Sequence, residues 1–109
     1  MAAADNAGAG VNLTFLEALL EGVKGVDQAL PTARELLRGV MATLEQLLHQ
    51  TNNKALIEHE LSVIKAQYDT AGEAYQEAPT DANLANMLNV AKEYAVCIIL
   101  QLRIYTPDV

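Results

Sequence analysis

Apolar residues recur at steps of three and four in two segments of the C-terminal half, the spacing of one face of an α-helix. These segments cover about residues 55–78 and 81–105. Pro79 lies between them and disfavours helical geometry at the residue before it, while Thr80 or Asp81 can cap the next helix. The pattern therefore predicts an antiparallel helical hairpin with a short turn at Pro79.

The two apolar stripes of this hairpin match each other in register. If the chain folds back symmetrically about Pro79, the facing pairs are Tyr75 with Leu84, Ala71 with Leu88, Tyr68 with Ala91, Ile64 with Ala95, Leu61 with Ile98, and Ile57 with Leu102. Three of these six layers place alanine opposite a larger side chain, as interdigitating packing requires. The heptad-like spacing is typical of coiled-coil packing.

The N-terminal half predicts one or two shorter helices. Thr14 with Glu17, and Thr32 with Glu35, have the spacing of capping boxes that begin helices. Apolar stripes follow each of them, and the polar stretch 49–54 then interrupts the pattern with a turn or kink near Asn52. Folding about Pro31 would form a second hairpin, with the pairs Val23 and Met41, Leu20 and Leu44, and Leu16 and Leu48.

Two stacked hairpins would cover the faces that each leaves bare, so the expected fold class is an all-α small helical bundle. Residues 1–11 are rich in alanine and glycine and are expected to form a disordered tail. Residues 12–109 are expected to form a single helical domain.

The segment 96–105 leaves two interpretations open. Leu100 to Tyr105 alternates apolar and polar residues as a strand does, whereas the stripe spacing favours a helix. A helix here would be apolar on every side from Ala95 to Leu100, so another helix or another molecule must cover it. The hypothesis is that the surface outside the hairpin seam is an interface, formed by Val96, Ile99, Leu100, Ile104 and Tyr105.

Charge and composition restrict the partners. The chain has 7 Lys and Arg against 14 Asp and Glu, a formal net charge of −7, which disfavours nucleic acid and anionic membrane surfaces. No apolar stretch reaches the roughly 18–20 residues of a membrane span. The N-terminus lacks the basic start and apolar core of a signal peptide. We therefore expect a protein that is cytoplasmic or is secreted without a cleavable signal peptide.

Side chains capable of chemistry are scattered. His49 and His59 do not follow a metal-binding spacing, and Glu45 and Glu58 near them are expected to be solvent-exposed. No phosphate-binding or nucleophile motif is present, and Cys97 lies in an apolar run without an adjacent base. The sequence predicts a protein that is not an enzyme and has no catalytic residues, metal site or cofactor.

One segment suggests a family. Ala74-Tyr75-Gln76-Glu77-Ala78-Pro79-Thr80-Asp81-Ala82-Asn83-Leu84, continuing to Lys92-Glu93-Tyr94, resembles the helix, Pro-x-Asp turn, helix hairpin of bacterial type III secretion needle subunits and related small helical components. The resemblance covers residues 74–94 only. It implies a building block that assembles by helix packing.

These features support two hypotheses for function. The first is a helical assembly protein that binds itself or a protein partner through helix packing, in which case it could belong to a bacterial secretion apparatus. The alternative is an acidic cytosolic chaperone or adaptor whose negative surface holds a client protein. Salt dependence distinguishes them, because contacts between charges weaken with ionic strength and apolar contacts do not.

Overall fold

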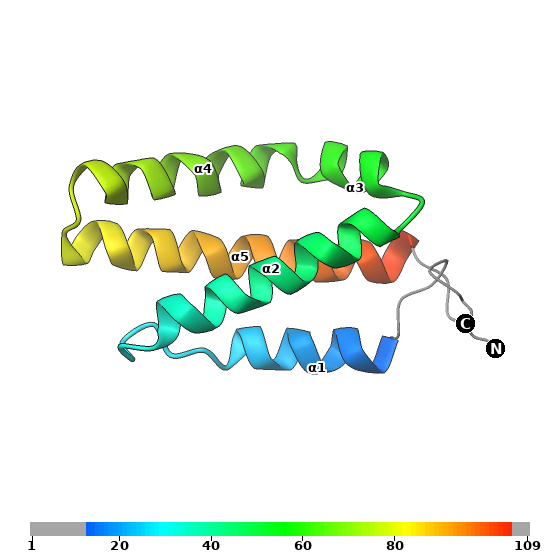
Figure 1. Cartoon of the computed structure of the whole chain (residues 1–109), viewed down its shortest axis with the longest axis horizontal. Helices are drawn as coiled ribbons and strands as arrows, with labels where there is room; N and C mark the ends of the chain where they lie inside the picture. The colour runs from blue at the N-terminus through cyan, green and yellow to red at the C-terminus, as the bar shows by residue number, and fades with distance from the viewer. Residues whose placement is uncertain (1–12, 106–109) are drawn as a thin grey trace.

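The computed structural model describes residues 13–105, which form five helices and, within that range, no strand (Figure 1). The helices are α1 (Leu13–Lys24), α2 (Ala33–Gln50), α3 (Lys54–Glu60), α4 (Ser62–Glu77) and α5 (Asp81–Tyr105). The all-α prediction is confirmed. The segment 96–105 is helical, so the strand interpretation is wrong. The predicted tail at residues 1–11 lies outside the described residues.

The predicted C-terminal hairpin is present, with three residues between the end of α4 and the start of α5. Thr80 caps α5, since its side-chain oxygen accepts a hydrogen bond from the Asn83 amide at 3.1 Å. The Asn83 side chain donates to the carbonyl oxygens of Ala78 at 2.8 Å and Ala74 at 3.3 Å. Both carbonyl oxygens also accept backbone hydrogen bonds, Ala74 from the Ala78 amide at 3.0 Å and Ala78 from the Thr80 amide at 2.7 Å. The Asn83 side chain therefore adds a second donor to each.

The sequence pattern predicts one continuous helix for the first arm of the hairpin. The structure instead has two helices there, α3 and α4. Leu61 separates α3 from α4 with backbone angles of φ −96° and ψ 4°. Its amide still donates to the Ile57 carbonyl at 3.0 Å, and its carbonyl accepts from Lys65 at 2.9 Å. Because the side chain of Leu61 is buried, the bend occurs at the face that packs on the core.

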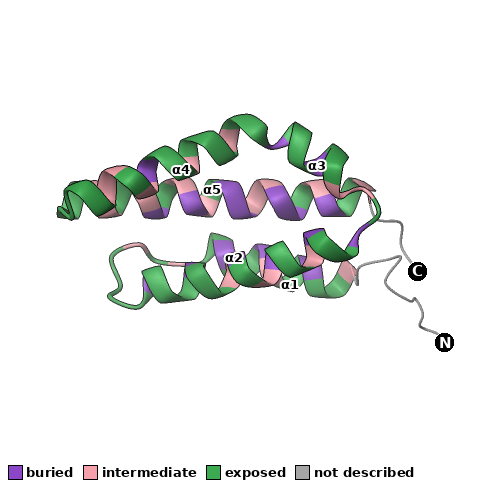
Figure 2. Ribbon diagram, turned by 45° about the horizontal axis from the view of Figure 1, so that its top comes forward, coloured by how far each residue is buried: buried purple, intermediate pink, exposed green. Residues whose placement is uncertain are grey.

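Helix α5 is the centre of the described fold. It contacts each of the other four helices, whereas α2 and α4 have no backbone approach to each other. Burial differs in the same way between helices. In Figure 2 buried residues (purple) recur along α5, whereas α4 is mostly exposed (green). Several helices of the same chain therefore cover much of the segment from Ala95 to Leu100, which is apolar on every side.

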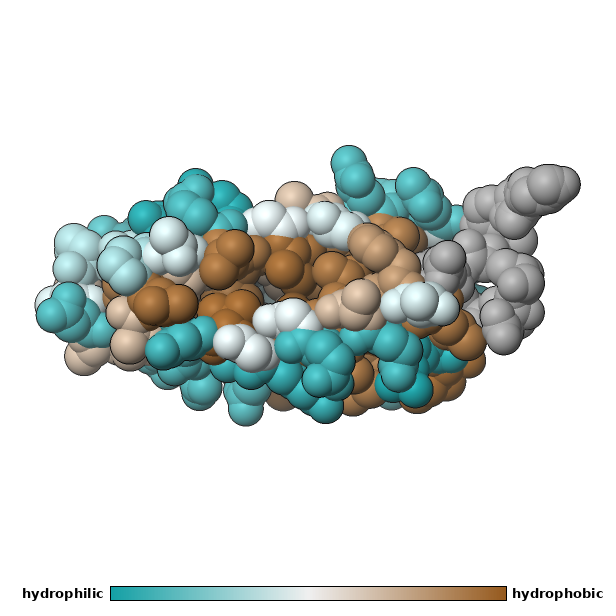
Figure 3. All heavy atoms as spheres, turned by 90° about the horizontal axis from the view of Figure 1, so that it is seen from below, coloured by the Kyte–Doolittle hydropathy of each residue, from teal (hydrophilic) through white to brown (hydrophobic). Residues whose placement is uncertain are grey.

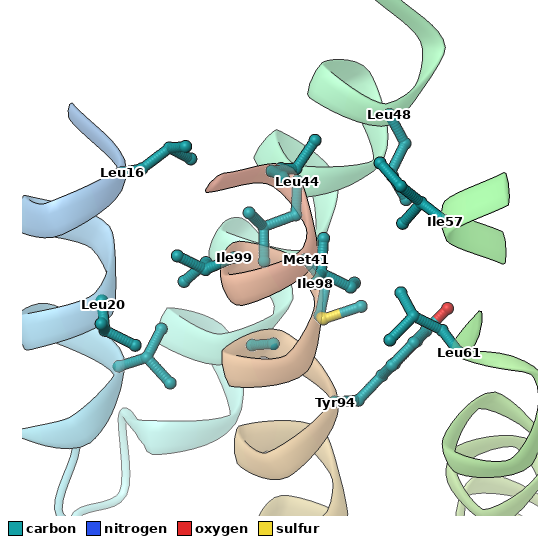
Figure 4. Close-up of a cluster of buried hydrophobic side chains, with 13 residues drawn as sticks. Leu16, Leu20, Met41, Leu44, Leu48, Ile57, Leu61, Tyr94, Ile98 and Ile99 are labelled. Atoms are coloured by element: carbon teal, nitrogen blue, oxygen red, sulfur yellow. The ribbon is translucent and has the colours of Figure 1, made fainter. Parts of the chain in front are cut away.

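The N-terminal half differs from the predicted second hairpin. α1 and α2 run antiparallel, and the residues of the three predicted pairs are all buried, but the two helices make little backbone contact with each other. The buried side chains of the three pairs join one cluster with Ala95, Ile98, Ile99 and Leu102 of α5 (Figure 4). Ala33 and Leu37 of α2 form a second cluster with Leu88 and Ala91 of α5. Each helix thus packs on α5 rather than on its neighbour in sequence.

Two of the predicted helix starts are altered in detail. α1 begins at Leu13, so Thr14 lies inside the first turn instead of preceding it. Thr32 does precede α2, but its side chain makes no capping hydrogen bond there. The predicted turn near Asn52 and Asn53 is confirmed between α2 and α3, and the Asn53 side chain donates to the carbonyl oxygen of Tyr105 at 2.8 Å.

Candidate interaction surfaces

The five residues predicted as an interface are divided between core and surface. Ile104 is 69% exposed and Leu100 is 40% exposed, while Val96 and Tyr105 are half-buried. Ile99 has no exposed surface, so its assignment to an open interface is wrong. In Figure 4 its side chain points toward α1, which carries Leu16 and Leu20. Ile99 is a core residue because α1 covers that side of α5.

A shallow groove follows the side of α5 that lies between α1 and α4. Val96 and Cys97 of α5 line it with Ile64 of α4, and Lys24 of α1 closes one end. Val96 is therefore the only one of the five predicted interface residues among those that line this groove. Leu100 lies one turn beyond Val96 on the same helix and continues the apolar surface.

Polar contacts bind α1 and the following loop to this side of α5. Arg103 forms an ion pair with Glu17 at 3.0 Å. Lys92 donates from Nζ to the carbonyl oxygen of Val26 at 2.8 Å. Of the charged residues that line the groove, Lys92 is therefore engaged by a contact within the chain.

A second apolar surface follows the seam between α1 and α2, and we call it the α1–α2 band. Phe15, Leu19 and Gly22 lie at helical spacing on α1, and Leu36, Val40, Thr43 and Leu47 do so on α2. Phe15 is 44% exposed and Leu36 is 50% exposed, whereas Leu19, Val40 and Leu47 are partly buried against the core. Viewed from the α1 side, Figure 3 shows a continuous brown strip along the long axis.

Neither stripe of the α1–α2 band contains a charged residue, although the whole chain has a net charge of −7. Small residues border the apolar strip, among them Ala18 on α1 and Gly39 on α2, both of which are exposed. A Cβ atom added at Gly22 or Gly39 would meet no heavy atom within 4 Å. The surface above both glycines is open.

None of the residues of this band is among those predicted as an interface, although the sequence contains a signal for it. The positions 36, 40, 43 and 47 repeat at steps of four, three and four, one position before the buried stripe that begins at Leu37. The spacing of Leu37, Met41, Leu44 and Leu48 predicts the buried stripe, and in the sequence alone Val40 and Leu47 only widen that stripe toward the core. Only the arrangement of α1 and α2 around α5 shows that the second stripe remains partly exposed.

The residues considered for catalysis do not converge. His49, His59 and Glu45 are exposed, and Glu58 forms an ion pair with Lys54 at 3.2 Å. Within residues 13–105, no group of three or more His, Cys, Asp or Glu side chains could hold a metal ion. Burial raises the pKa of the Cys97 thiol, and Glu93 raises it further. Cys97 is therefore protonated at neutral pH and is a poor nucleophile.

One small cavity of about 120 Å³ lies between α2, α4 and α5. Met41, Met87 and Tyr68 contribute apolar surface to it, and Arg34 and Arg38 lie at its edge. Arg34 is placed over the ring of Tyr75 at 5.3 Å, and Arg38 pairs with Glu35 at 3.4 Å. Both guanidinium groups thus have partners within the chain, but only the contact of Arg34 with Tyr75 connects α2 to α4, because Glu35 and Arg38 both lie on α2.

None of the helices in the described region combines the length and the apolar character that a membrane span requires. No protein-family model matches the chain, and no curated protein or solved structure is significantly similar to it.

Proposed function

We propose that this protein is a non-enzymatic helical assembly protein that binds itself or another protein by helix packing. The α1–α2 band is the observation that carries the proposal. Contiguous apolar surface of this kind on a small protein usually marks an interaction site. Phe15 and Leu36 both leave about half of their surface in water, so covering them provides a hydrophobic driving force for association.

The local geometry supports binding by helices. α1 and α2 run antiparallel on either side of the apolar strip, which includes Gly22 and has Ala18 and Gly39 beside it. Small residues allow the backbone of an incoming helix to approach closely, and large residues between them supply the buried area. The surface therefore suits a partner that also presents helices.

The resemblance of residues 74–94 to type III secretion needle subunits supports one setting for such assembly. The segment forms the end of α4, a three-residue turn and the first half of α5, the kind of hairpin that the resemblance implies. We propose a small component of a bacterial secretion apparatus as that setting.

Quantitative affinity purification from the native organism tests the proposal. Three tagged baits are compared: the natural chain, Gly39→Glu and Gly72→Glu. Both substitutions place the same charge at a helical glycine whose Cβ position is open, but Gly72 is on α4, away from the α1–α2 band. We expect at least one captured protein, which can be the untagged chain itself, to bind the natural bait and the Gly72→Glu bait but not the Gly39→Glu bait. If every captured protein is retained by both variants, the band is not a binding site.

An acidic adaptor is the second candidate, and one feature favours it. Glu73, Glu77 and Asp81 lie exposed around the turn between α4 and α5. A basic client bound there would dissociate as salt is raised from about 0.05 M to about 0.5 M, because the screening length falls to a few ångströms. Partners bound through the apolar band would be retained over the same range.

A further inference from the structure

We propose that the partner of the α1–α2 band is a second copy of this chain, and that two copies pack these bands face to face about a two-fold axis. The inference rests on the proposed function and names the partner of the same surface. In such a contact the same patch of both copies is used, so each patch must be complementary to itself.

Charge is the first argument for a second copy. In a chain of net charge −7, most contacts between two copies bring carboxylates together. For example, α3 and α4 together carry the carboxylates of Glu58, Glu60, Asp69, Glu73 and Glu77 against only Lys54 and Lys65, which pair with Glu58 and Asp69. A two-fold contact through the α1–α2 band brings no charged side chain of one stripe against another, because neither stripe has one. A basic partner would instead bind more favourably to the acidic faces of the chain than to the uncharged α1–α2 band.

The side chains beside the band are the second argument. Glu17 is the acidic residue of α1 closest in sequence to Phe15, and it is turned toward Arg103 of α5 at 3.0 Å. Small residues, Ala18 on α1 and Gly39 on α2, border the apolar strip instead. Two copies can therefore bring their apolar strips together at these positions without displacing a charged or bulky side chain.

The area of the band sets the expected strength. α2 has 18 residues and α1 has 12. At about 1.5 Å per residue and a helix width of about 10 Å, they present about 450 Å² per copy, or about 900 Å² in the dimer. Specific interfaces begin near 1,200 Å² and weak ones lie below that value, so we expect a dimer with a dissociation constant of about 1 to 100 µM.

Sedimentation velocity of the purified chain over about 1 to 500 µM tests the inference, because the range spans the expected dissociation constant. The natural chain should shift from monomer to dimer. Gly39→Glu should raise the dissociation constant at least about tenfold, since it places two carboxylates in the contact. Gly72→Glu should dimerise like the natural chain, and Gly39→Ala, which adds no charge, should retain the dimer. Circular dichroism should show the same helicity in all four proteins.

Three results would overturn the inference. A natural chain that stays monomeric at the highest concentration excludes the second copy as partner, while loss of another protein from the Gly39→Glu bait would still support the proposed function. A dimer that Gly39→Glu leaves unchanged places the contact on a different surface. Open-ended growth into species of increasing size excludes a closed two-fold contact, because a head-to-tail contact is needed to form such species.

Discussion

Tyr68 of α4 and Tyr94 of α5 pack against each other, with ring centroids 5.2 Å apart and ring planes tilted by 41°. Tyr94 is buried, although it lies outside the predicted seam of the hairpin, and in Figure 4 it points toward Leu61. Tilted aromatic pairs contribute about 0.5–1.5 kcal/mol beyond the area they bury. The pair therefore helps to hold α4 on α5 next to the bend at Leu61.

The tyrosine pair predicts a loss of stability in alkaline solution. Burial raises the pKa of both Tyr68 and Tyr94, because it disfavours the phenolate. The unfolded chain then releases these protons at a lower pH than the folded protein does, so their contribution is complete below about pH 10 and decreases as the pH rises further. A chain with both Tyr68→Phe and Tyr94→Phe should lose less stability between about pH 9 and pH 11 than the natural chain.

Urea unfolding at the two pH values measures this difference. The double variant removes only the two hydroxyl groups and keeps the rings, so packing is largely preserved. An equal decrease in the free energy of unfolding for both proteins would show that these hydroxyl groups do not titrate differently on folding.

Ile99 and Ile104 provide a matched pair on α5, one buried completely and the other 69% exposed. Ile99→Ala should reduce the free energy of unfolding by about 2–5 kcal/mol, because it leaves a cavity between α1 and α5. Ile104→Ala should change it by less than about 0.5 kcal/mol. Thermal or chemical unfolding at low protein concentration measures both. Similar effects of the two substitutions would contradict the placement of α1 over Ile99.

Asn83 and Asn86 test the turn of the hairpin in the same way. The side chain of Asn83 bonds to the carbonyl oxygens of Ala74 and Ala78, whereas Asn86 is exposed on the next turn of α5. Asn83→Ala should destabilise the protein by about 1 kcal/mol relative to Asn86→Ala. Both changes alter helix propensity alike, so the difference in unfolding free energy isolates the turn contacts. A difference near zero would mean that water replaces them without cost.

The sequence predicts the α4–α5 hairpin well, because both helices present regular stripes to each other and Pro79 separates them. It does not predict the bend at Leu61, since the stripe continues through that residue without a change of phase. It also assigns Ile99 to the wrong side. A helix from Ala95 to Leu100 is apolar on every side. Periodicity alone therefore cannot tell which of its sides are buried by other helices of the same chain.

The α1–α2 pair shows the same limit. Its buried stripes are predicted correctly, but the partner that they pack against is not, because Leu20 and Leu44 could meet each other or meet a third helix equally well. Once α5 takes that place, the stripe that contains Leu36 becomes a surface. The candidate interface therefore depends on the arrangement of three helices and not on the pattern of any one of them.

Amide hydrogen exchange at two protein concentrations tests the central claim, self-assembly through the α1–α2 band, most directly. Association stabilises the elements in contact and slows the opening from which their amides exchange. We predict that peptides from residues 13–24 and 33–50 exchange more slowly at about 300 µM than at about 1 µM, a range that spans the expected dissociation constant. Peptides from 62–77 should be unchanged. Slower exchange confined to 62–77 and 96–105, or no concentration dependence at all, would contradict the claim.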